Sequence, residues 1–144
     1  MKGTTTCFPC LRGEYQDQLG LPSCKVCPVN TISKERNSSN CEKCQLGKTT
    51  AIEGGAAKCE MCDYGKFGSS KGVCSACPAG RYQDSKGQTE CIECHVGELY
   101  VSAKTSCRGC GLGKYGSSNG KCSACPAGRY QDGKGQTECI ECER

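Results

Sequence analysis

The spacing of the cysteines is the feature that most constrains this chain. All 18 cysteines fall into nine Cys-x-x-Cys pairs, and each pair begins 15 to 18 residues after the one before it. The pairs are Cys7 and Cys10, Cys24 and Cys27, Cys41 and Cys44, Cys59 and Cys62, Cys74 and Cys77, Cys91 and Cys94, Cys107 and Cys110, Cys122 and Cys125, and Cys139 and Cys142. A period of this length indicates an array of short structural repeats.

A second regularity follows the pairs. The third residue after each of the first eight pairs is Gly or Asn: Gly13, Asn30, Gly47, Gly65, Gly80, Gly97, Gly113 and Gly128. These two residue types accept positive φ most readily, so we expect positive φ at these positions. Two residues further on stand Tyr15, Ile32, Thr49, Phe67, Tyr82, Leu99, Tyr115 and Tyr130. We expect these side chains to pack on the nearest disulfide; an exposed ladder that binds sugar or protein is the alternative.

A longer period indicates recent duplication. The three cysteines Cys59, Cys74 and Cys91 recur 48 residues later, and the segment from Cys74 to Asp84 returns letter for letter from Cys122. A diverged copy opens the chain. We therefore divide one continuous array into three blocks, residues 1–58, 59–106 and 107–144.

The composition leaves little material for a conventional core. The hydrophobic fraction is 35% with 18 cysteines included, there is no Trp, and there are only two Phe and 20 Gly. Backbone ordering costs roughly 1–2 kcal/mol per residue, whereas a disulfide that closes a loop of about 15 residues contributes on the order of 3 kcal/mol. The sequence predicts a small disulfide-rich fold with little or no helix, an elongated array of short irregular β-hairpins stacked as a solenoid-like rod.

Zinc ribbons are the main rival to disulfides, because they also use paired Cys-x-x-Cys motifs. Four tetrathiolate sites would use sixteen of the cysteines, and Cys107, Cys110, Cys122 and Cys125 form a plausible ligand set. Zinc knuckles use backbone N–H groups after the second cysteine, and three of the pairs are followed by a proline, which has none: Pro28, Pro78 and Pro126. We therefore predict disulfides and no metal site.

No pattern for catalysis or cofactor binding is present. The Cys7–Cys10 pair encloses Phe-Pro in the manner of a redox active site, but no βαβ pattern surrounds it. His95 is the only histidine and does not recur with the repeats. The net charge of +4 is spread over the loops and forms no basic run, so we predict neither nucleic-acid binding nor membrane insertion.

Cysteine usage of this density is typical of an oxidising compartment, so we expect an extracellular or cell-surface location. Asn37-Ser38-Ser39 is a candidate N-glycosylation site at Asn37. The opening residues contain no apolar h-region, and no signal peptide is therefore expected in this segment. The chain is interpreted as a segment of a longer array.

The motif Cys-x-x-Cys-Pro-Ala-Gly-Arg-Tyr, at Cys74–Tyr82 and Cys122–Tyr130, resembles the ephrin-receptor-like cysteine-rich repeat. It resembles the tumour necrosis factor receptor module more loosely, and long arrays of this type are similar to protist surface and extracellular proteins. The resemblance implies an extracellular disulfide-bonded repeat without enzymatic activity, used as stalk, spacer, adhesive surface or receptor segment.

The resemblance also implies a modular disulfide pattern, in which adjacent pairs join first cysteine to first and second to second. That pattern comprises Cys7–Cys24, Cys10–Cys27, Cys41–Cys59, Cys44–Cys62, Cys74–Cys91, Cys77–Cys94, Cys122–Cys139 and Cys125–Cys142, and it leaves Cys107 and Cys110 to each other or to another chain. The alternative is a ladder in which the second cysteine of each pair bonds the first of the next. The ladder treats every repeat alike, as the Gly series does.

The predicted function is that of a non-enzymatic structural or surface scaffold, or of a component of a fibrous assembly. Its partners would be further copies or a larger extracellular assembly. The first alternative is a receptor-type ectodomain segment that binds a protein ligand, and the second is a zinc-binding scaffold with four-cysteine sites.

Overall fold

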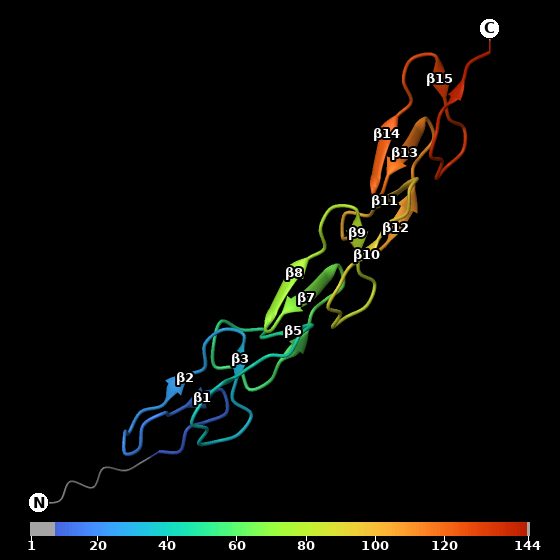
Figure 1. The fold of residues 1–144 in the computed structure, drawn as a ribbon. Helices are drawn as coiled ribbons and strands as arrows, with labels where there is room; N and C mark the ends of the chain where they lie inside the picture. The colour runs from blue at the N-terminus through green and yellow to red at the C-terminus, as the bar shows by residue number, and fades with distance from the viewer. Residues whose placement is uncertain (1–7, 144) are drawn as a thin grey trace, which may run out of the picture. The chain divides into compact units, whose positions relative to one another are not determined.

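The computed structural model describes residues 8–143. Within that range it contains sixteen short β-strands and no helix. The strands pair into eight two-stranded antiparallel sheets, each made of two strands consecutive in sequence (Figure 1). They are β1 Glu14–Tyr15, β2 Lys25–Val26, β3 Thr31–Ile32, β4 Glu42–Lys43, β5 Lys48–Thr49, β6 Glu60–Met61, β7 Lys66–Ser70, β8 Val73–Ala76, β9 Arg81–Tyr82, β10 Ile92–Glu93, β11 Glu98–Tyr100, β12 Cys107–Gly109, β13 Lys114–Ser118, β14 Lys121–Ala124, β15 Arg129–Tyr130 and β16 Ile140–Glu141. The predicted fold class, small, disulfide-rich and built of hairpins, is confirmed.

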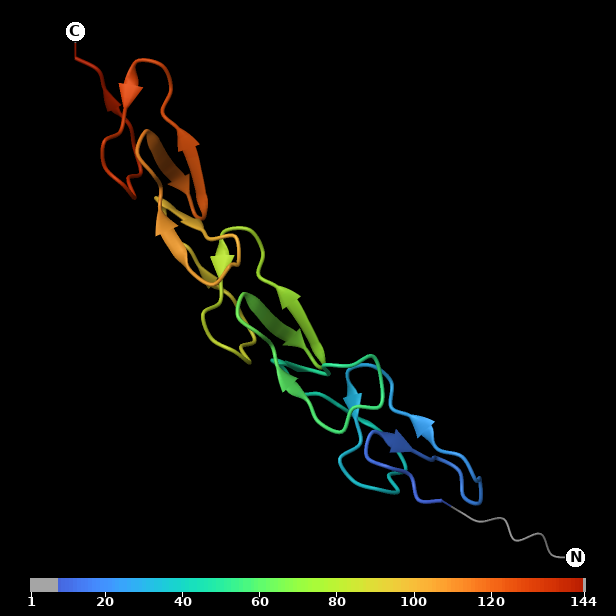
Figure 2. The same ribbon diagram turned by 180° about the vertical axis from the view of Figure 1, so that it is seen from behind.

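One rule places all sixteen strands on the sequence motif. The first strand of each hairpin begins directly after the Gly or Asn position, and the second strand lies at the following Cys-x-x-Cys pair. In the first hairpin, Glu14 pairs with Val26 and Tyr15 with Lys25. One of the two longest hairpins, β13–β14, adds a bulge between Tyr115 and Ser118, and its two strands lie side by side in both views (Figures 1 and 2).

The predicted backbone conformation at the start of each hairpin is confirmed. All eight positions have positive φ, from 65° at Asn30 to 86° at Gly97. The chain turns sharply there, so that the segment after a cysteine pair can enter a new strand. Most L-residues with a β-carbon are strained in this conformation, which explains why Gly and Asn occupy the series.

The interior consists mainly of sulfur. The largest side chains that are fully buried are all second cysteines of their pairs: Cys27, Cys44, Cys62, Cys77, Cys94 and Cys110. The first cysteines of the described pairs are half-buried. Ile32, Cys44 and Ala56 form a small buried cluster on which Cys59 packs. The cross-links therefore occupy the place that aliphatic side chains take in a larger domain.

The chain divides into two compact units. Unit 1 comprises the described residues up to Cys62 together with Gly68–Cys74, and unit 2 comprises Asp63–Phe67 and the described residues from Ser75 onward. Each unit contains several repeats joined by backbone hydrogen bonds. No helix in the described part of the chain is long and apolar enough to cross a membrane.

Candidate functional site

The disulfides form a ladder. In each of the eight bonds, the second cysteine of one pair joins the first cysteine of the next, across 12 to 15 residues. The bonds are Cys10–Cys24, Cys27–Cys41, Cys44–Cys59, Cys62–Cys74, Cys77–Cys91, Cys94–Cys107, Cys110–Cys122 and Cys125–Cys139. The modular pattern implied by the resemblance is therefore wrong, and the ladder alternative is the observed one.

The physical reason lies in the strand inside each cysteine pair. Cys24 and Cys27 flank the extended residues of β2, and they are three residues apart. Because side chains alternate along a strand, two positions an odd number of residues apart point to opposite faces. One cysteine therefore meets the preceding repeat and the other meets the following one. Cys7 lies outside the described residues, and the exposed Cys142 has no disulfide partner among the described ones.

A backbone hydrogen bond accompanies every step of the ladder. The N–H of the second cysteine of each pair donates to the carbonyl of the Gly or Asn that opens the same hairpin. Cys27 donates to Gly13 at 2.9 Å and Cys110 to Gly97 at 2.7 Å, and the bond recurs in all eight hairpins. The same residue that sets the turn thus also closes the base of the hairpin, which gives the Gly series two roles.

Backbone bonds also join successive repeats. The N–H of Gly13 donates to the Ser33 carbonyl at 2.9 Å, and the N–H of Gly113 donates to the Gln131 carbonyl at 2.7 Å. In both cases the acceptor stands three residues after the opening position of the next hairpin. The equivalent acceptors for Gly47, Gly65 and Gly97 are Gly68, Gln83 and Gly116. In these five repeats the link runs through the main chain and needs no particular side chain, whereas the Asn30 N–H donates to the Thr50 hydroxyl at 3.0 Å.

The repeats also approach their second neighbours. A β-carbon built on Gly97 would lie 2.4 Å from the Gly135 carbonyl oxygen, and one on Gly13 would lie 1.9 Å from that of Gly55. A β-carbon on Gly120 would lie 2.1 Å from the Cα of Gly80. The loop of one repeat thus packs on the turn two repeats earlier, and no side chain fits between them. The cysteine spacing contains no signal for this contact.

A glutamine holds the loop in three of the repeats, and it is buried in two of them. The carboxamide of Gln83, which is 4% exposed, donates to the Glu90 carbonyl at 2.6 Å and accepts from the Ser85 N–H at 3.1 Å. The buried Gln131 does the same with Glu138 and Gly133. In the sequence, Gln-Asp follows the Gly-x-Tyr motif at Gln16, Gln83 and Gln131. Its threefold recurrence is the signal that could have identified this clamp.

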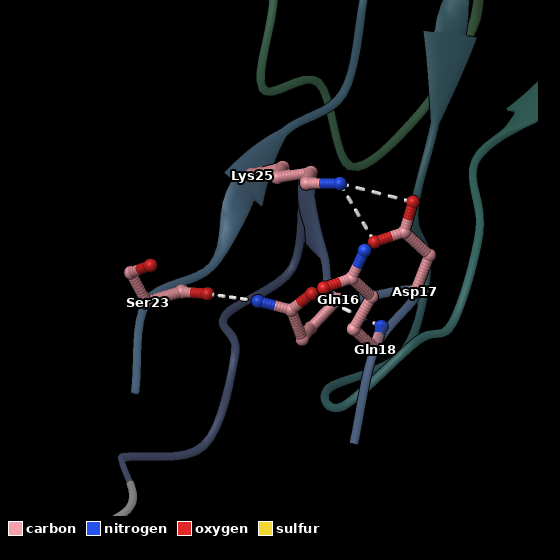
Figure 3. Close-up of polar contacts among 5 residues, drawn as sticks. All are labelled: Gln16, Asp17, Gln18, Ser23 and Lys25. Carbon is pink, nitrogen blue, oxygen red and sulfur yellow. Dashed lines mark hydrogen bonds and ion pairs between the residues drawn. The ribbon is translucent and has the colours of Figure 1, made fainter. Parts of the chain in front are cut away.

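The third glutamine, in the first repeat, lies beside a bidentate ion pair (Figure 3). The carboxamide of Gln16 donates to the Ser23 carbonyl and accepts from the Gln18 N–H, while Lys25 Nζ lies 2.7 and 3.0 Å from the two Asp17 carboxylate oxygens. The hydrogen bond to Lys25 lowers the pKa of Asp17, and the same bond raises the pKa of Lys25. The pair joins the loop to β2 at an exposed position.

A second polar cluster lies in unit 2. Lys86 Nζ lies 3.2 Å from Asp63 Oδ1 and 5.1 Å from the centroid of the Tyr64 ring. The Tyr64 N–H donates to the Asp63 carboxylate at 2.9 Å, and this bond, followed by the Lys86 contact, lowers the pKa of Asp63. The Asp63 and Lys86 side chains are both largely accessible to solvent, so the cluster orients the loop more than it stabilises the fold.

The aromatic and apolar series after the glycines lies across the hairpins. Ile32 packs in the small core with Cys44, which confirms the predicted packing for this one member of the series. Tyr82 stands opposite Ile92 on the partner strand, and Tyr130, which is 45% exposed, stands opposite Ile140. These cross-strand pairs are typical stabilising contacts of antiparallel sheets.

The four cysteines considered as zinc ligands are all in disulfides. The set of Cys107, Cys110, Cys122 and Cys125 is divided among three disulfides, and a disulfide sulfur is no thiolate ligand. Among residues 8–143 no three His, Cys, Asp or Glu side chains are grouped as for a metal ion. His95 is exposed beside Cys94, and its N–H donates to the Glu98 carboxylate at 2.9 Å.

Two further candidate residues can be placed. Cys10, which belongs to the pair with a superficial likeness to a redox motif, is bonded to Cys24. Asn37, the glycosylation candidate, is exposed in a turn with φ of 59°, and its N–H donates to the Cys10 carbonyl at 3.1 Å. The side chain is thus accessible, and glycosylation stays a prediction.

Comparison with known proteins agrees with this geometry. The profile of a family described as tyrosine-protein kinase ephrin type A/B receptor-like matches residues 1–44, 65–104 and 113–144. The chain is 30% identical over 90 residues, 62% of its length, to the rat and mouse proteins named sushi, von Willebrand factor type A, EGF and pentraxin domain-containing protein 1. It is 32% identical over 92 residues, 64% of its length, to zebrafish signal peptide, CUB and EGF-like domain-containing protein 2.

The matched segments are small parts of these relatives, 2% of the rat and mouse proteins and 8% of the zebrafish protein. The family match covers most of the chain and includes both near-identical copies of the Cys-Pro-Ala-Gly-Arg-Tyr motif. With its eight disulfide-closed hairpins, the chain belongs to the ephrin-receptor-like family of extracellular cysteine-rich repeats.

Proposed function

We propose that this chain acts as a structural scaffold of an extracellular or cell-surface protein, without catalytic activity. The observation that carries the proposal is the repeated backbone linkage: each hairpin is closed by the same disulfide and the same Gly or Asn carbonyl bond. Because every hairpin has an equivalent disulfide and an equivalent backbone hydrogen bond, neighbouring repeats are joined in the same way along the chain, although the chain has few apolar residues. A scaffold needs this regular linkage between modules and does not need an enclosed substrate pocket.

The surface supports association with further copies or with a larger assembly. The second residue after the second cysteine of a pair is an exposed large apolar side chain in several repeats, among them Leu46 at 48%, Val96 at 45% and Leu112 at 62% exposure. Apolar side chains that recur at one place in successive modules are typical of contact surfaces. The partners proposed are therefore further extracellular repeats.

Sedimentation velocity and electron microscopy of the oxidised protein over a range of concentrations test this proposal. We expect concentration-dependent association that weakens when Leu46, Val96 and Leu112 are all replaced by serine. Replacement of the exposed Lys71 by serine serves as the control. A monomer at every concentration, with the triple variant indistinguishable from wild type, would refute assembly and would favour the alternative, a receptor segment for a protein ligand.

A further inference from the structure

A groove where the third block begins is lined by three cationic side chains. The groove, about 440 Å³ in volume, is bordered by Leu99, Arg108, Gly109, Cys110, Gly111, Lys114, Cys122 and Lys134. Arg108, Lys114 and Lys134 are exposed, and none of them has a carboxylate within 4.0 Å among the described residues. No acidic residue of the described chain borders the groove.

The backbone fixes the places from which these cations project. Arg108 lies on β12 opposite Leu99 of β11, so the two side chains share one face of the hairpin. The loop that carries Lys134 is bound to this hairpin, because the Gly135 N–H donates to the Cys110 carbonyl at 2.9 Å. A β-carbon on Gly109 would lie 3.0 Å from Gly135. The groove is thus a feature of the packed repeats and not of a mobile side chain.

The nearest acidic residue of the hairpin faces away from the groove. Glu98 is opposite Gly109 and next to Leu99 on β11, so its side chain leaves the other face of the strand pair. Its carboxylate accepts the His95 N–H at 2.9 Å. Glu98 therefore does not neutralise Arg108.

The internal duplication provides a comparison for this charge. The positions 48 residues earlier than Arg108 and Gly111 are Glu60 and Asp63, while Lys114 and Lys134 correspond to Lys66 and Lys86. In the second block the acids are paired, Glu60 with Lys58 at 3.5 Å and Asp63 with Lys86 at 3.2 Å. These four positions hold two acids and two lysines in the second block, and three cations and a glycine in the third. At these four positions both acids of the second block are lost in the third, and one of them is replaced by a cation.

Arg108 directly follows the first cysteine of its pair, and the residues at this position in the other repeats differ in charge. In the ladder this position holds Lys25, Glu42, Glu60, Ser75, Ile92, Arg108, Ser123 and Ile140. Lys25 is paired with Asp17, and Glu42 borders the corresponding groove of unit 1, where it lies 3.6 Å from Lys34. Within the described residues, Arg108 is thus the one cation of this series without an ion pair.

We propose that the groove around Arg108 binds a sulfated polysaccharide. A guanidinium flanked by two ammonium groups suits ligands with several oxyanions. The repeats are extracellular, where sulfated glycans supply such a polyanion. The apolar surface of Leu99 and the backbone at Gly109 and Gly111 leave space for a sugar ring between the charged side chains. This proposal does not depend on the scaffold function.

The test measures binding of a heparin-class sulfated oligosaccharide to the oxidised protein by calorimetry near physiological salt. The variants are Arg108→Glu, which introduces the residue of the second block, and Gly111→Asp, which does the same at a position where a β-carbon meets no atom within 4 Å. Lys71→Glu is the control, because it makes the same change of charge as Arg108→Glu at an exposed site outside the groove.

We expect Arg108→Glu to weaken binding about tenfold or more and to reduce the dependence of affinity on salt. Gly111→Asp should weaken it severalfold, and Lys71→Glu should leave it within about twofold of wild type. The unit 1 groove is bordered by Glu42 and by four lysines, Lys34, Lys43, Lys48 and Lys58, which would account for residual binding. Equal losses in Arg108→Glu and Lys71→Glu would overturn the proposal in favour of diffuse charge attraction, as would wild-type affinity in both groove variants.

Two further probes separate the class of ligand. The same oligosaccharide without its sulfate groups should bind at least about tenfold more weakly, since the charged contacts depend on them. A polyglutamate peptide should also bind more weakly and without sensitivity to Arg108→Glu. If the peptide bound as tightly as the sulfated sugar and lost affinity in the same variant, the groove would be a site for acidic protein segments and the proposal would be wrong.

Discussion

Two glycines with the same backbone conformation and different surroundings separate two reasons for glycine in the series: positive φ and close contact with the second-neighbour repeat. Gly65 and Gly113 are equivalent positions 48 residues apart, with φ of 69° and 70°. Each N–H donates to a glutamine carbonyl of the next repeat, and each carbonyl accepts a cysteine N–H at 2.9 Å. A β-carbon on Gly65 would lie 2.4 Å from the Ala103 carbonyl oxygen, whereas one on Gly113 would meet nothing within 4 Å.

Replacement of either glycine by alanine puts a β-carbon into the left-handed region, which costs about 1–2 kcal/mol. The smaller conformational entropy of the unfolded chain returns about 0.4–1 kcal/mol. Gly113→Ala should therefore destabilise its repeat by about 1 kcal/mol. Gly65→Ala must also displace a backbone segment, and such overpacking adds about 1–3 kcal/mol. We expect Gly65→Ala to cost about 2–4 kcal/mol in total.

The assay is native-state hydrogen exchange, because the repeats need not unfold together and a single global midpoint is then poorly defined. The reporters are the Cys77 N–H for Gly65→Ala and the Cys125 N–H for Gly113→Ala, each bonded to the substituted residue. The excess loss of protection at Cys77 should be roughly five- to 150-fold, since 1.4 kcal/mol corresponds to a factor of ten. Equal losses at both amides would refute the argument that contact with the second-neighbour repeat requires glycine, and unchanged protection at both would refute the conformational argument as well.

Three other predictions follow from the same contacts. Mass spectrometry of unreduced proteolytic peptides should show a Cys27–Cys41 cross-link, and strong reductant but not a chelator should unfold the protein; persistence of dispersed NMR resonances in reductant would contradict this. Gln83→Ala should lower the local free energy of unfolding by about 1–3 kcal/mol, because it removes both hydrogen bonds of the buried carboxamide. Gln83→Glu should retain the acceptor half of the clamp, and hydrogen exchange in the Gln83 loop measures both. The Asp17–Lys25 pair contributes stability above the unfolded pKa of Asp17, and this stability is lost as pH falls through the lowered folded pKa. An NMR titration should therefore show a higher Asp17 pKa in Lys25→Ala than in wild type. An unchanged pKa would show that the pair does not form in solution.

Local features of the fold could be read from the sequence because they depend on single residues. Positive φ after each cysteine pair follows from Gly and Asn, which tolerate it, and the scarcity of helix follows from the lack of apolar spacing at 3.6 residues. The reliance on cross-links followed from the small number of apolar residues. The family, too, could be recognised from the short motif around Tyr82, because that motif contains both the cysteines and the turn.

The partners of these residues could not be read in the same way. The number and spacing of the cysteines leave both the modular and the ladder disulfide patterns open. The modular pattern is excluded only by the opposite directions of the two cysteine side chains that flank a strand such as β2. The role of Gln83 was also hidden, since a buried carboxamide and an exposed one look alike in sequence. The charge of the third-block groove depends on Lys134, which is distant from Arg108 in sequence.

The sequence by itself determined what each repeat is: a cysteine pair, a turn with positive φ and a short hairpin. The tertiary structure decided how repeats join, through the cysteines that face opposite neighbours and through loops that pack on the turn two repeats earlier, as Gly135 does on Gly97. The physical reason is that backbone conformation is a local property. Disulfide choice and close backbone contact depend on distances between segments, which no single segment specifies.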